Sequence, residues 1–327
     1  MKINRRIFCG AVAASISLPI SFNAWASNNY PSKVIKAVVP FPPGGGGDTL
    51  ARLVFTRLSE NLGQSIVIEN MPGAGGNVGT ANVARAPADG YSLLYGTNGT
   101  HAINSSIYKK LNFDPLKDFQ PVSRFTEIAA IVAVRTDLPV GSIKELIEYS
   151  KNSQSPLTFG SAGNGTTSHL AAEMFKQLNG LNWTHVPYKG GAAALTDLMG
   201  GRIDVLIDVA PNVGQHIAGG RIKALAVTTA ERSKPFTQLP TVIESGVPNY
   251  VVTAWDGLFV PANTPSAIVE KLTQAVHQTL QEPALKEQLE ARVAVASPLS
   301  PNEFKDFIAA ESLRWAEVVK KSGATLD

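Results

Sequence analysis

The sequence predicts an α/β protein built from two α/β halves with a cleft between them. Strand-like and helix-like segments alternate along the chain, which is typical of a parallel sheet covered by helices. The alternation begins again near residue 129, so two such halves are expected. A length of 327 residues corresponds to about two domains. With 44% hydrophobic and 17% charged residues, the composition is that of a globular chain.

The first half reads βαβαβ. Strands are expected at residues 34–39, 65–70 and 92–96, with helices at 48–62 and 76–85. In the first of these helices, Leu50, Val54, Leu58 and Leu62 recur at helical spacing and form one apolar stripe. The pattern of the first half therefore predicts a parallel sheet with helices packed on it.

The second half repeats the pattern. Strands are expected at residues 129–134, 157–160, 183–186, 205–208 and 225–228, and helices at 142–150, 167–178 and 191–200. An extended segment at 251–260 and amphipathic helices at 265–280 and 301–321 follow. The last helix carries Phe304, Phe307, Ile308 and Trp315 on its apolar face.

Residues 1–26 have the three parts of a secretory signal peptide: a basic start, an apolar run from Ile7 to about Ile20, and the small residues of Ala24-Trp25-Ala26. The run is shorter than the ~20 apolar residues of a spanning helix, and Pro19 interrupts it. Arg5-Arg6 also fits a twin-arginine signal, so the export route stays open. We expect a cleaved signal peptide and a mature protein in the periplasm.

Charge and cysteine content exclude several classes of partner. Three of the 29 basic residues and none of the 26 acidic residues lie in the leader, so the remaining chain is formally neutral. A neutral chain is a poor nucleic-acid binder, because attraction to phosphate requires clustered Lys and Arg. The one cysteine, Cys9, also lies in the leader, which excludes disulfides and thiolate metal sites from the mature chain. We expect no cofactor and no metal.

Glycine-rich turns follow four predicted strands, at residues 40–48, 71–77, 96–101 and 160–169. Glycine lets backbone N–H groups approach a ligand, and a helix that starts at such a turn favours an anion. We expect Asp48 to cap the first helix. Glycine and asparagine also serve ordinary turns, so one such turn alone says little. Four at the carboxyl ends of strands indicate a ligand site, because open α/β sheets bind ligands there.

Nucleotide and enzyme motifs do not fit. A P-loop requires Gly-Lys-Ser/Thr, whereas Gly47 is followed by Asp48-Thr49. The glycines Gly73, Gly75 and Gly79 miss the dinucleotide spacing by one position and follow the second strand rather than the first. Ser161 stands one place too early for a nucleophile elbow. His169 fits a ligand contact or a buried hydrogen-bonded role, and both stay open.

Asp208 is a second open case. It ends the predicted strand at 205–208 and is expected either to point into the cleft or to cap the loop formed by residues 209–212. A cleft carboxylate would suit the ammonium or hydroxyl group of an amino acid or hydroxy acid, and would disfavour a bare dicarboxylate. The aromatic residues Phe41 and Trp255 would admit an aromatic acid.

A series of motifs in order resembles the substrate-binding proteins of tripartite tricarboxylate transporters, the Bug family. The matching segments are Tyr30-Pro31 with Lys33, Val39 to Gly45 with Asp48 and Ala51-Arg52, Glu69-Asn70 with Pro72 to Gly76, Ala86 to Tyr91, Gly160 to Gly163 with Gly165-Thr166 and His169-Leu170, Val186 to Gly190, Gly200-Gly201 with Asp204-Val205, Ala224 to Thr228, and Trp255 with Gly257-Leu258 and Pro261-Ala262. The likeness covers the whole mature chain. One departure is the all-glycine run Gly44 to Gly47, where relatives often have Ser, Thr or Pro.

This resemblance implies a type II periplasmic binding-protein fold, with two α/β lobes, a hinge and a ligand cleft between the lobes. The lobes would be residues 27–126 plus 249–327, and residues 127–248. It implies a receptor for a small carboxylate (an amino acid, a di- or tricarboxylate or an aromatic acid) that serves membrane permease subunits as a monomer. The residues it places at the ligand are Phe41, Pro43, Gly44, Gly45, Asp48, Gly75, Thr97, Ser161, Gly163, Thr166, Thr167, His169 and Asp208.

Two other functions stay open beside this one. A ligand sensor that docks to a signalling partner would share every feature above. A secreted enzyme acting on a small acid would require a nucleophile or acid–base constellation, and the sequence does not supply one.

Overall fold

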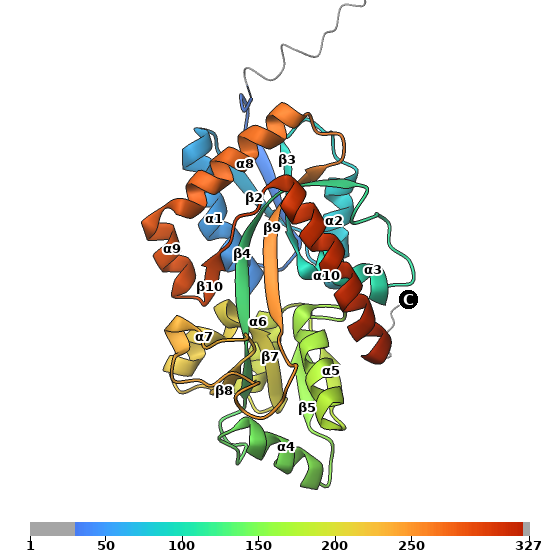
Figure 1. Ribbon diagram of the computed structural model, residues 1–327, viewed down its shortest axis with the longest axis vertical. Helices are drawn as coiled ribbons and strands as arrows, with labels where there is room; N and C mark the ends of the chain where they lie inside the picture. The colour runs from blue at the N-terminus through green and yellow to red at the C-terminus, as the bar shows by residue number, and fades with distance from the viewer. Residues whose placement is uncertain (1–29, 323–327) are drawn as a thin grey trace, which may run out of the picture. The chain divides into compact units, whose positions relative to one another are not determined.

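The computed structural model describes residues 30–322, so the predicted signal peptide lies outside the described residues. Ten strands form one curled sheet (Figure 1). The strands along it are β2 (Ile66–Asn70), β1 (Ile35–Val39), β3 (Ser92–Thr97), β9 (Thr253–Pro261), β4 (Phe119–Val134), β7 (Val205–Val209), β5 (Thr158–Ser161) and β6 (Thr184–Pro187), with β8 (Lys223–Val227) and β10 (Ala294–Ala296) also paired to β4. The parallel pairs β1–β2, β1–β3, β5–β6 and β5–β7 lie on opposite sides of β9 and β4, as a two-lobed α/β protein requires.

β4 joins the two sets of strands. Its residues 119–129 pair with β9, whereas residues 130–134 pair with β7 and residues 131–134 with β8. We call the part with β1, β2 and β3 the first lobe and the part with β5, β6, β7 and β8 the second lobe. The residue limits of the lobes stay a prediction, because β4 runs through position 126 as one strand.

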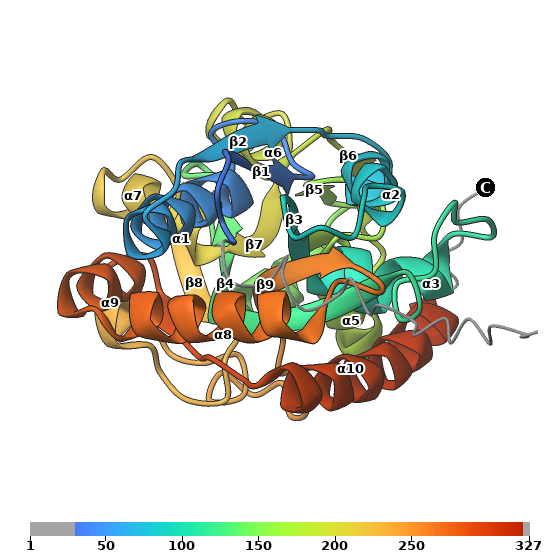
Figure 2. The same ribbon diagram turned by 90° about the horizontal axis from the view of Figure 1, so that it is seen from above.

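Helices cover both parts of the sheet (Figure 2). They are α1 (Gly46–Leu62), α2 (Asn77–Ala84), α3 (Asn104–Ile107), α4 (Ile143–Asn152), α5 (Thr167–Asn179), α6 (Gly191–Met199), α7 (Ala210–Ala218), α8 (Ser266–Gln281), α9 (Pro283–Glu290) and α10 (Pro301–Ser322). Short turns of helix, η2 (Ala74–Gly76), η3 (Gly99–Ile103) and η4 (Lys234–Phe236), complete the set. α1 packs beside α8, and α10 packs on β4 and η3.

Every strand and helix predicted above is present, and all but β4 lie within a few residues of the predicted bounds. β4 begins at Phe119, ten residues before the predicted start at 129. The structure also adds elements that the sequence did not predict. Residues 209–212 are not a loop: Val209 ends β7, and Ala210 to Asn212 begin α7. The first turn of α7 contains Pro211, because proline is tolerated where the N–H has no helical partner. Pro283 likewise opens the unpredicted α9. The helix expected from Asp48 starts earlier, at Gly46, with Gly45 as its N-cap, so the capping role expected of Asp48 is wrong.

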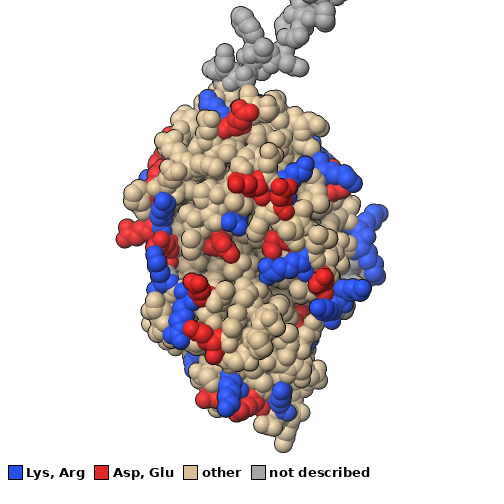
Figure 3. All heavy atoms as spheres, in the orientation of Figure 1, with Lys and Arg blue, Asp and Glu red and all other residues tan. Residues whose placement is uncertain are grey.

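The C-terminal helix closes the core as its apolar stripe predicts. Phe304, Ile308 and Trp315 are buried. The indole N–H groups of Trp255 and Trp315 both donate to Glu311, which satisfies two polar groups inside the core. On the face shown in Figure 3, Lys and Arg are interspersed with Asp and Glu. No helix among residues 30–322 has both the length and the apolar character needed to cross a membrane.

Candidate functional site

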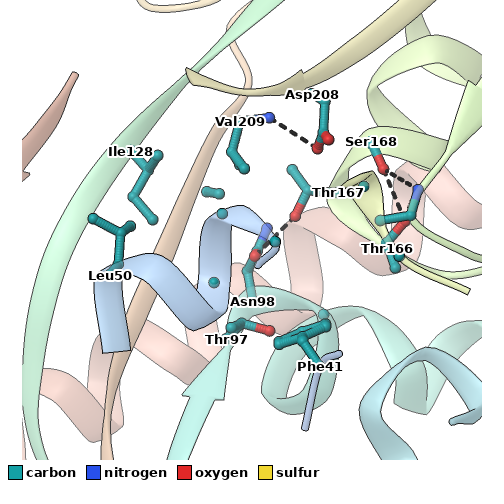
Figure 4. A pocket seen from close by; sticks show the side chains of 18 of the residues that line it. Phe41, Leu50, Thr97, Asn98, Ile128, Thr166, Thr167, Ser168, Asp208 and Val209 are labelled. Carbon is teal, nitrogen blue, oxygen red and sulfur yellow. Dashed lines mark hydrogen bonds between the residues drawn. The ribbon is translucent and has the colours of Figure 1, made fainter. Parts of the chain in front are cut away.

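A cavity of about 90 Å³ lies between the two lobes, over β4 and β9, which we call the crossing strands. Its apolar lining is Phe41, Pro42, Leu50, Tyr95, Ile128, Val209, Ala254 and Trp255, and its polar side chains are Thr97, Asn98, Thr166, Thr167, Ser168 and Asp208. The small residues Gly45 to Gly47, Gly75, Gly99, Ala162, Gly190 and Gly191 complete it. Figure 4 shows the labelled side chains facing a common space. No Lys, Arg or His belongs to this lining within the described part of the chain.

Three helices begin at the cavity wall. The first residues of α1, α5 and α6, or the caps before them, are Gly45 to Gly47, Thr166 to Ser168, and Gly190 to Gly191. None of the three N-caps makes a side-chain capping hydrogen bond. The first N–H groups of a helix have no partner within the helix, and its dipole places partial positive charge there. The wall therefore attracts a negatively charged group without a charged side chain.

The floor of the cavity comes from the crossing strands. Tyr95 on β3 donates a hydrogen bond to Asp256 on β9, whose other oxygen accepts from Thr126 Oγ1 at 2.6 Å and from the Thr126 N–H at 3.0 Å. Burial raises the pKa of Asp256 to about 6, although these hydrogen bonds oppose that effect. The network fixes Tyr95 against β9 and β4, the strands that connect the lobes.

The lobes approach each other closely at two glycines. A Cβ at Gly190 would lie 2.6 Å from Pro42 Cγ, and a Cβ at Gly46 would lie 2.9 Å from Val209 Cγ2. Real Cβ atoms do not approach a neighbour so closely, so a side chain at either position would force the lobes apart. Glycine is required here for the narrow spacing of the walls.

The α1 turn (residues 40–48) is held from behind by Asp48, which does not line the cavity. Asp48 accepts hydrogen bonds from the Gly44 N–H at 2.9 Å, from Arg52 Nε at 2.9 Å and from Asn70 Nδ2 at 2.8 Å. Asn70 Nδ2 also donates to the Phe41 carbonyl at 2.9 Å. Burial alone would raise the pKa of Asp48, but the hydrogen bonds from Arg52, Asn70 and Gly44 outweigh it and lower the pKa. Asp48 thus positions the turn.

The α5 turn (residues 160–169) is held by hydroxyl and imidazole groups. Thr166 Oγ1 donates to the Gly163 carbonyl at 2.6 Å, and the Ala162 N–H donates to Ser168 Oγ at 2.8 Å. His169 Nδ1 accepts from the Gly165 N–H at 3.2 Å, which is the hydrogen-bonded alternative left open above. Burial, and secondarily the charges of neighbouring groups, lower the pKa of His169 to about 3. The ring is therefore neutral at physiological pH.

Behind the same turn, Ser161 Oγ lies 2.7 Å from Nε2 of His185, and the His185 ring stacks on His169 with centroids 4.1 Å apart. Ser161 is fully buried and lies outside the cavity lining. Within residues 30–322 the hydrogen-bond partner of His185 is this hydroxyl and not a carboxylate, and burial lowers the pKa of His185 to about 4. This contact joins the end of β5 to β6 behind the α5 turn.

Asp208 combines both roles that the sequence left open. It lines the cavity at the end of β7, and it accepts from the Val209 N–H at 2.9 Å and from Asn212 Nδ2 at 2.6 Å, both at the start of α7. Burial raises the pKa of Asp208 to about 6, although the two hydrogen bonds act in the opposite direction. Of the residues that the structure describes, it is the one carboxyl in the lining, so its protonation state sets the charge that a guest meets.

The structure brings together seven of the predicted site residues and leaves six outside the lining. Those that line the cavity are Phe41, Gly45, Gly75, Thr97, Thr166, Thr167 and Asp208. Those outside it are Pro43, Gly44, Asp48, Ser161, Gly163 and His169. Gly163 instead lines a neighbouring groove of about 550 Å³, together with Tyr108 and Lys189. For all thirteen predicted site residues, contact with a ligand stays a prediction.

Sequence reasoning missed several lining residues. The floor residues Tyr95 and Ala254 lie within a predicted strand and a predicted extended segment, and Ile128 lies just before the strand predicted at 129–134. Gly190-Gly191 and Asn98 follow strand ends. The Gly190-Gly191 pair and the polar turn residue Asn98 are sequence features that could have indicated these lining positions. Among residues 30–322, no three His, Cys, Asp or Glu side chains gather in a way that could hold a metal ion.

Comparison with known proteins identifies the family and the fold. The profile of the family described as "Tripartite tricarboxylate transporter family receptor" matches residues 50–324. The structure of R. palustris Rpa4515 with adipate is 40% identical, covers 91% of this chain and 100% of its own, and superposes with a TM-score of 0.89. The periplasmic binding protein BugD is 35% identical over 90% of this chain and 99% of its own, with a TM-score of 0.86.

MatC from Rhodopseudomonas palustris with bound malate is 34% identical, covers 89% of this chain and 100% of its own, and has a TM-score of 0.84. These similarities confirm the predicted two-lobed periplasmic binding-protein fold. Since the family profile spans most of the sequence and these structures match both lobes, the chain belongs to the receptors of the tripartite tricarboxylate transporter family.

Proposed function

We propose that this protein captures a small carboxylate in the periplasm and delivers it to the permease subunits of a tripartite transporter. The observation that carries the proposal is the convergence of three helix N-termini without side-chain caps on one cavity, whose lining in the described part of the chain contains no Lys or Arg. Such a wall neutralises carboxylate oxygens with backbone amides. The similar proteins Rpa4515 and MatC, solved with adipate and with malate, support this class of ligand.

The available interactions are sufficient for useful affinity. A Kd of 1 μM corresponds to about 8 kcal/mol. Each helix N-terminus contributes roughly 0.3–2 kcal/mol, and each hydrogen bond to a charged group roughly 1.5–3 kcal/mol. Four or five such contacts, with water excluded by both lobes, reach this range before ordering costs are subtracted.

Asp208 would select among carboxylates. When ionised it favours a guest whose far end carries an ammonium or a hydroxyl group, because either can donate to the free lone pairs of the carboxylate. A bare dicarboxylate would bind better when Asp208 is protonated, since two buried like charges repel each other. We therefore propose a small hydroxy or amino acid as the preferred guest at neutral pH.

Transport would proceed from a monomer exported with a cleaved signal peptide of residues 1–26. Ligand would close the lobe of residues 27–126 plus 249–327 onto the lobe of residues 127–248 by a hinge motion, because the closed arrangement gives both walls contact with the guest. The permease would then recognise the closed form. The family of transporter receptors supports this partner.

Native mass spectrometry of protein purified without denaturation tests the proposal by showing what the protein carries. Titration with L-malate, succinate, adipate and L-aspartate then measures affinity by calorimetry. Trp255 lines the cavity, so its fluorescence reports occupancy independently. We expect one ligand per chain and a smaller radius of gyration on binding. If no acid binds and scattering is unchanged by the whole panel, the receptor proposal is wrong.

A further inference from the structure

Asn98 has an amide group that the fold itself does not satisfy. It stands between the end of β3 and η3, lines the cavity, and has an exposed fraction of 1%. Its Oδ1 accepts a hydrogen bond from Thr167 Oγ1 at 2.9 Å, but Nδ2 has no hydrogen-bond partner among residues 30–322. Native proteins rarely leave a buried donor without a partner, because it has lost its hydration and gained nothing in return.

The surroundings of Nδ2 explain what is missing. Figure 4 shows the Asn98 amide beneath Thr167 and facing the space that Ile128, Val209 and Leu50 border. The side chains of these three lining residues are apolar and carry no hydrogen-bond acceptor. A guest in the cavity is therefore the available source of an acceptor oxygen.

The Asn98–Thr167 hydrogen bond also joins the two lobes. Asn98 follows β3 in the first lobe, whereas Thr167 is the first residue of α5 in the second lobe. The amide oxygen is thus engaged by one lobe while the amide N–H groups stay available to a guest. An asparagine side chain supplies both functions at once, since it carries one acceptor and two donors.

We propose that Asn98 Nδ2 donates a hydrogen bond to a carboxylate oxygen of the ligand and that the Thr167–Asn98 bond holds the amide in the orientation this contact requires. This inference rests on the proposed carboxylate receptor and adds a specificity residue to it. The ligand completes a chain from Thr167 through Asn98 to the guest, so binding favours the arrangement in which the two lobes meet.

Two substitutions at Asn98 test the donor. Asn98→Leu removes it at similar size, and Asn98→Asp replaces it with an acceptor that repels a carboxylate. Calorimetry with L-malate and adipate is expected to show roughly 10- to 100-fold weaker binding for Asn98→Leu, the usual worth of a hydrogen bond to a charged group. Asn98→Asp is expected to lose more. Asn182→Asp, an exposed position before β6, is the charge-matched control and should bind as the natural protein does.

Thr167→Val tests the coupling. It keeps the shape and removes the hydroxyl, and should weaken binding several-fold in the natural background but not further in Asn98→Leu. If the two losses add in full, Thr167 acts on the ligand by itself and the proposed orientation is wrong. Thermal melting without ligand identifies a variant that fails to fold, in which case the remaining substitutions decide.

The outcomes separate the two proposals. If the natural protein binds no acid of the panel, the receptor proposal fails, and this inference fails with it. If the natural protein binds and both Asn98 variants bind equally well, the receptor proposal stands and the role of Asn98 is refuted.

Discussion

The α1 turn and the α5 turn face the same cavity, yet they are supported by different chemistry. Behind the α1 turn stands a charged group, Asp48, paired with the half-exposed Arg52. Behind the α5 turn stand hydroxyl groups and the imidazoles of His169 and His185, which burial keeps neutral. Both turns place the first residues of the helix that follows at the cavity and their ionisable side chains behind it. The comparison teaches that the site separates binding groups from supporting groups, and that the two supports should respond differently to acid.

Acid should lower the free energy of unfolding first through His169 behind the α5 turn, and this is the largest effect we expect. Burial depresses the pKa of His169 to about 3, well below the ~6.5 of an unfolded chain. Between pH 6.5 and 3 the imidazole is therefore protonated in the unfolded state but not in the folded state. As the pH falls through this range, the free energy of unfolding decreases by up to about 1.4 kcal/mol per pH unit for this one group. The lowered pKa of Asp48 makes its own contribution disappear only below its unfolded value of 3.8.

His169→Asn isolates that effect, because Asn Oδ1 can replace Nδ1 as the acceptor for the Gly165 N–H. Urea unfolding between pH 7 and 4.5 should give a shallower loss of stability for the variant than for the natural protein. The raised pKa values of Asp208 and Asp256 act in the opposite direction, but they are shared by both proteins and cancel in the difference. Equal slopes would mean that His169 titrates normally.

Removing Asp48, the charged group behind the α1 turn, should lower both stability and ligand affinity at neutral pH. Asp48→Ala leaves Arg52, Asn70 and the Gly44 N–H without their shared acceptor. We expect a loss of about 2 kcal/mol in the free energy of unfolding, since Arg52 can turn to water, whereas the partly buried bonds from the Gly44 N–H and Asn70 lose their acceptor. Ligand affinity should fall as well, because the α1 turn loses its anchor. Asp89→Ala is the control, as Asp89 makes an exposed ion pair with Lys33. Unchanged affinity would show that the turn is rigid without Asp48.

Gly190 is the position where the spacing between the lobes can be changed with little change to either turn. Its φ of 165° is extended and open to any residue, but a Cβ there would lie 2.6 Å from Pro42 Cγ. We expect Gly190→Ala to hold the lobes apart and to weaken ligand binding by about 10-fold, or about 1.4 kcal/mol. Gly219→Ala has room for its Cβ, 3.8 Å from the nearest atom, and should bind normally. If both variants bind alike, closure does not depend on this contact.

The sequence predicted the positions of these turns better than their chemistry. Glycine and proline patterns mark strand ends, so Phe41, Gly45, Gly75 and Thr167 could be placed at the cavity. Whether a side chain turns toward the cavity or behind it is a tertiary property: Asp48 turns back because Arg52 lies one helical turn on and Asn70 ends the neighbouring strand.

The floor residues could not be predicted for a related reason. Which face of a strand carries Ile128 depends on the register of β4 with β9, and that register shifts at Pro121–Ser123 and at Arg124–Thr126. Each bulge exchanges the two faces of the strand, so simple alternation fails. Asn98 was visible as a polar turn residue, but its unpartnered amide exists only in the folded arrangement.

Asp208 is the exception to the separation of binding and supporting groups, and it gives the smallest effect we predict. It supports the start of α7 and faces the cavity, with a pKa that burial raises to about 6. As pH falls from 7.5 to 5, protonation of Asp208 should tighten binding of a dicarboxylate such as succinate by a few-fold, because a like charge is removed. For L-aspartate the same protonation should weaken binding, since an acceptor for the ammonium group is lost. Asp208→Asn should abolish both trends, and measuring each acid against both proteins cancels the titration of the acid itself. Parallel pH profiles for the two proteins would show that Asp208 only holds α7, and the selection among carboxylates would then fall to the uncharged groups of the cavity wall.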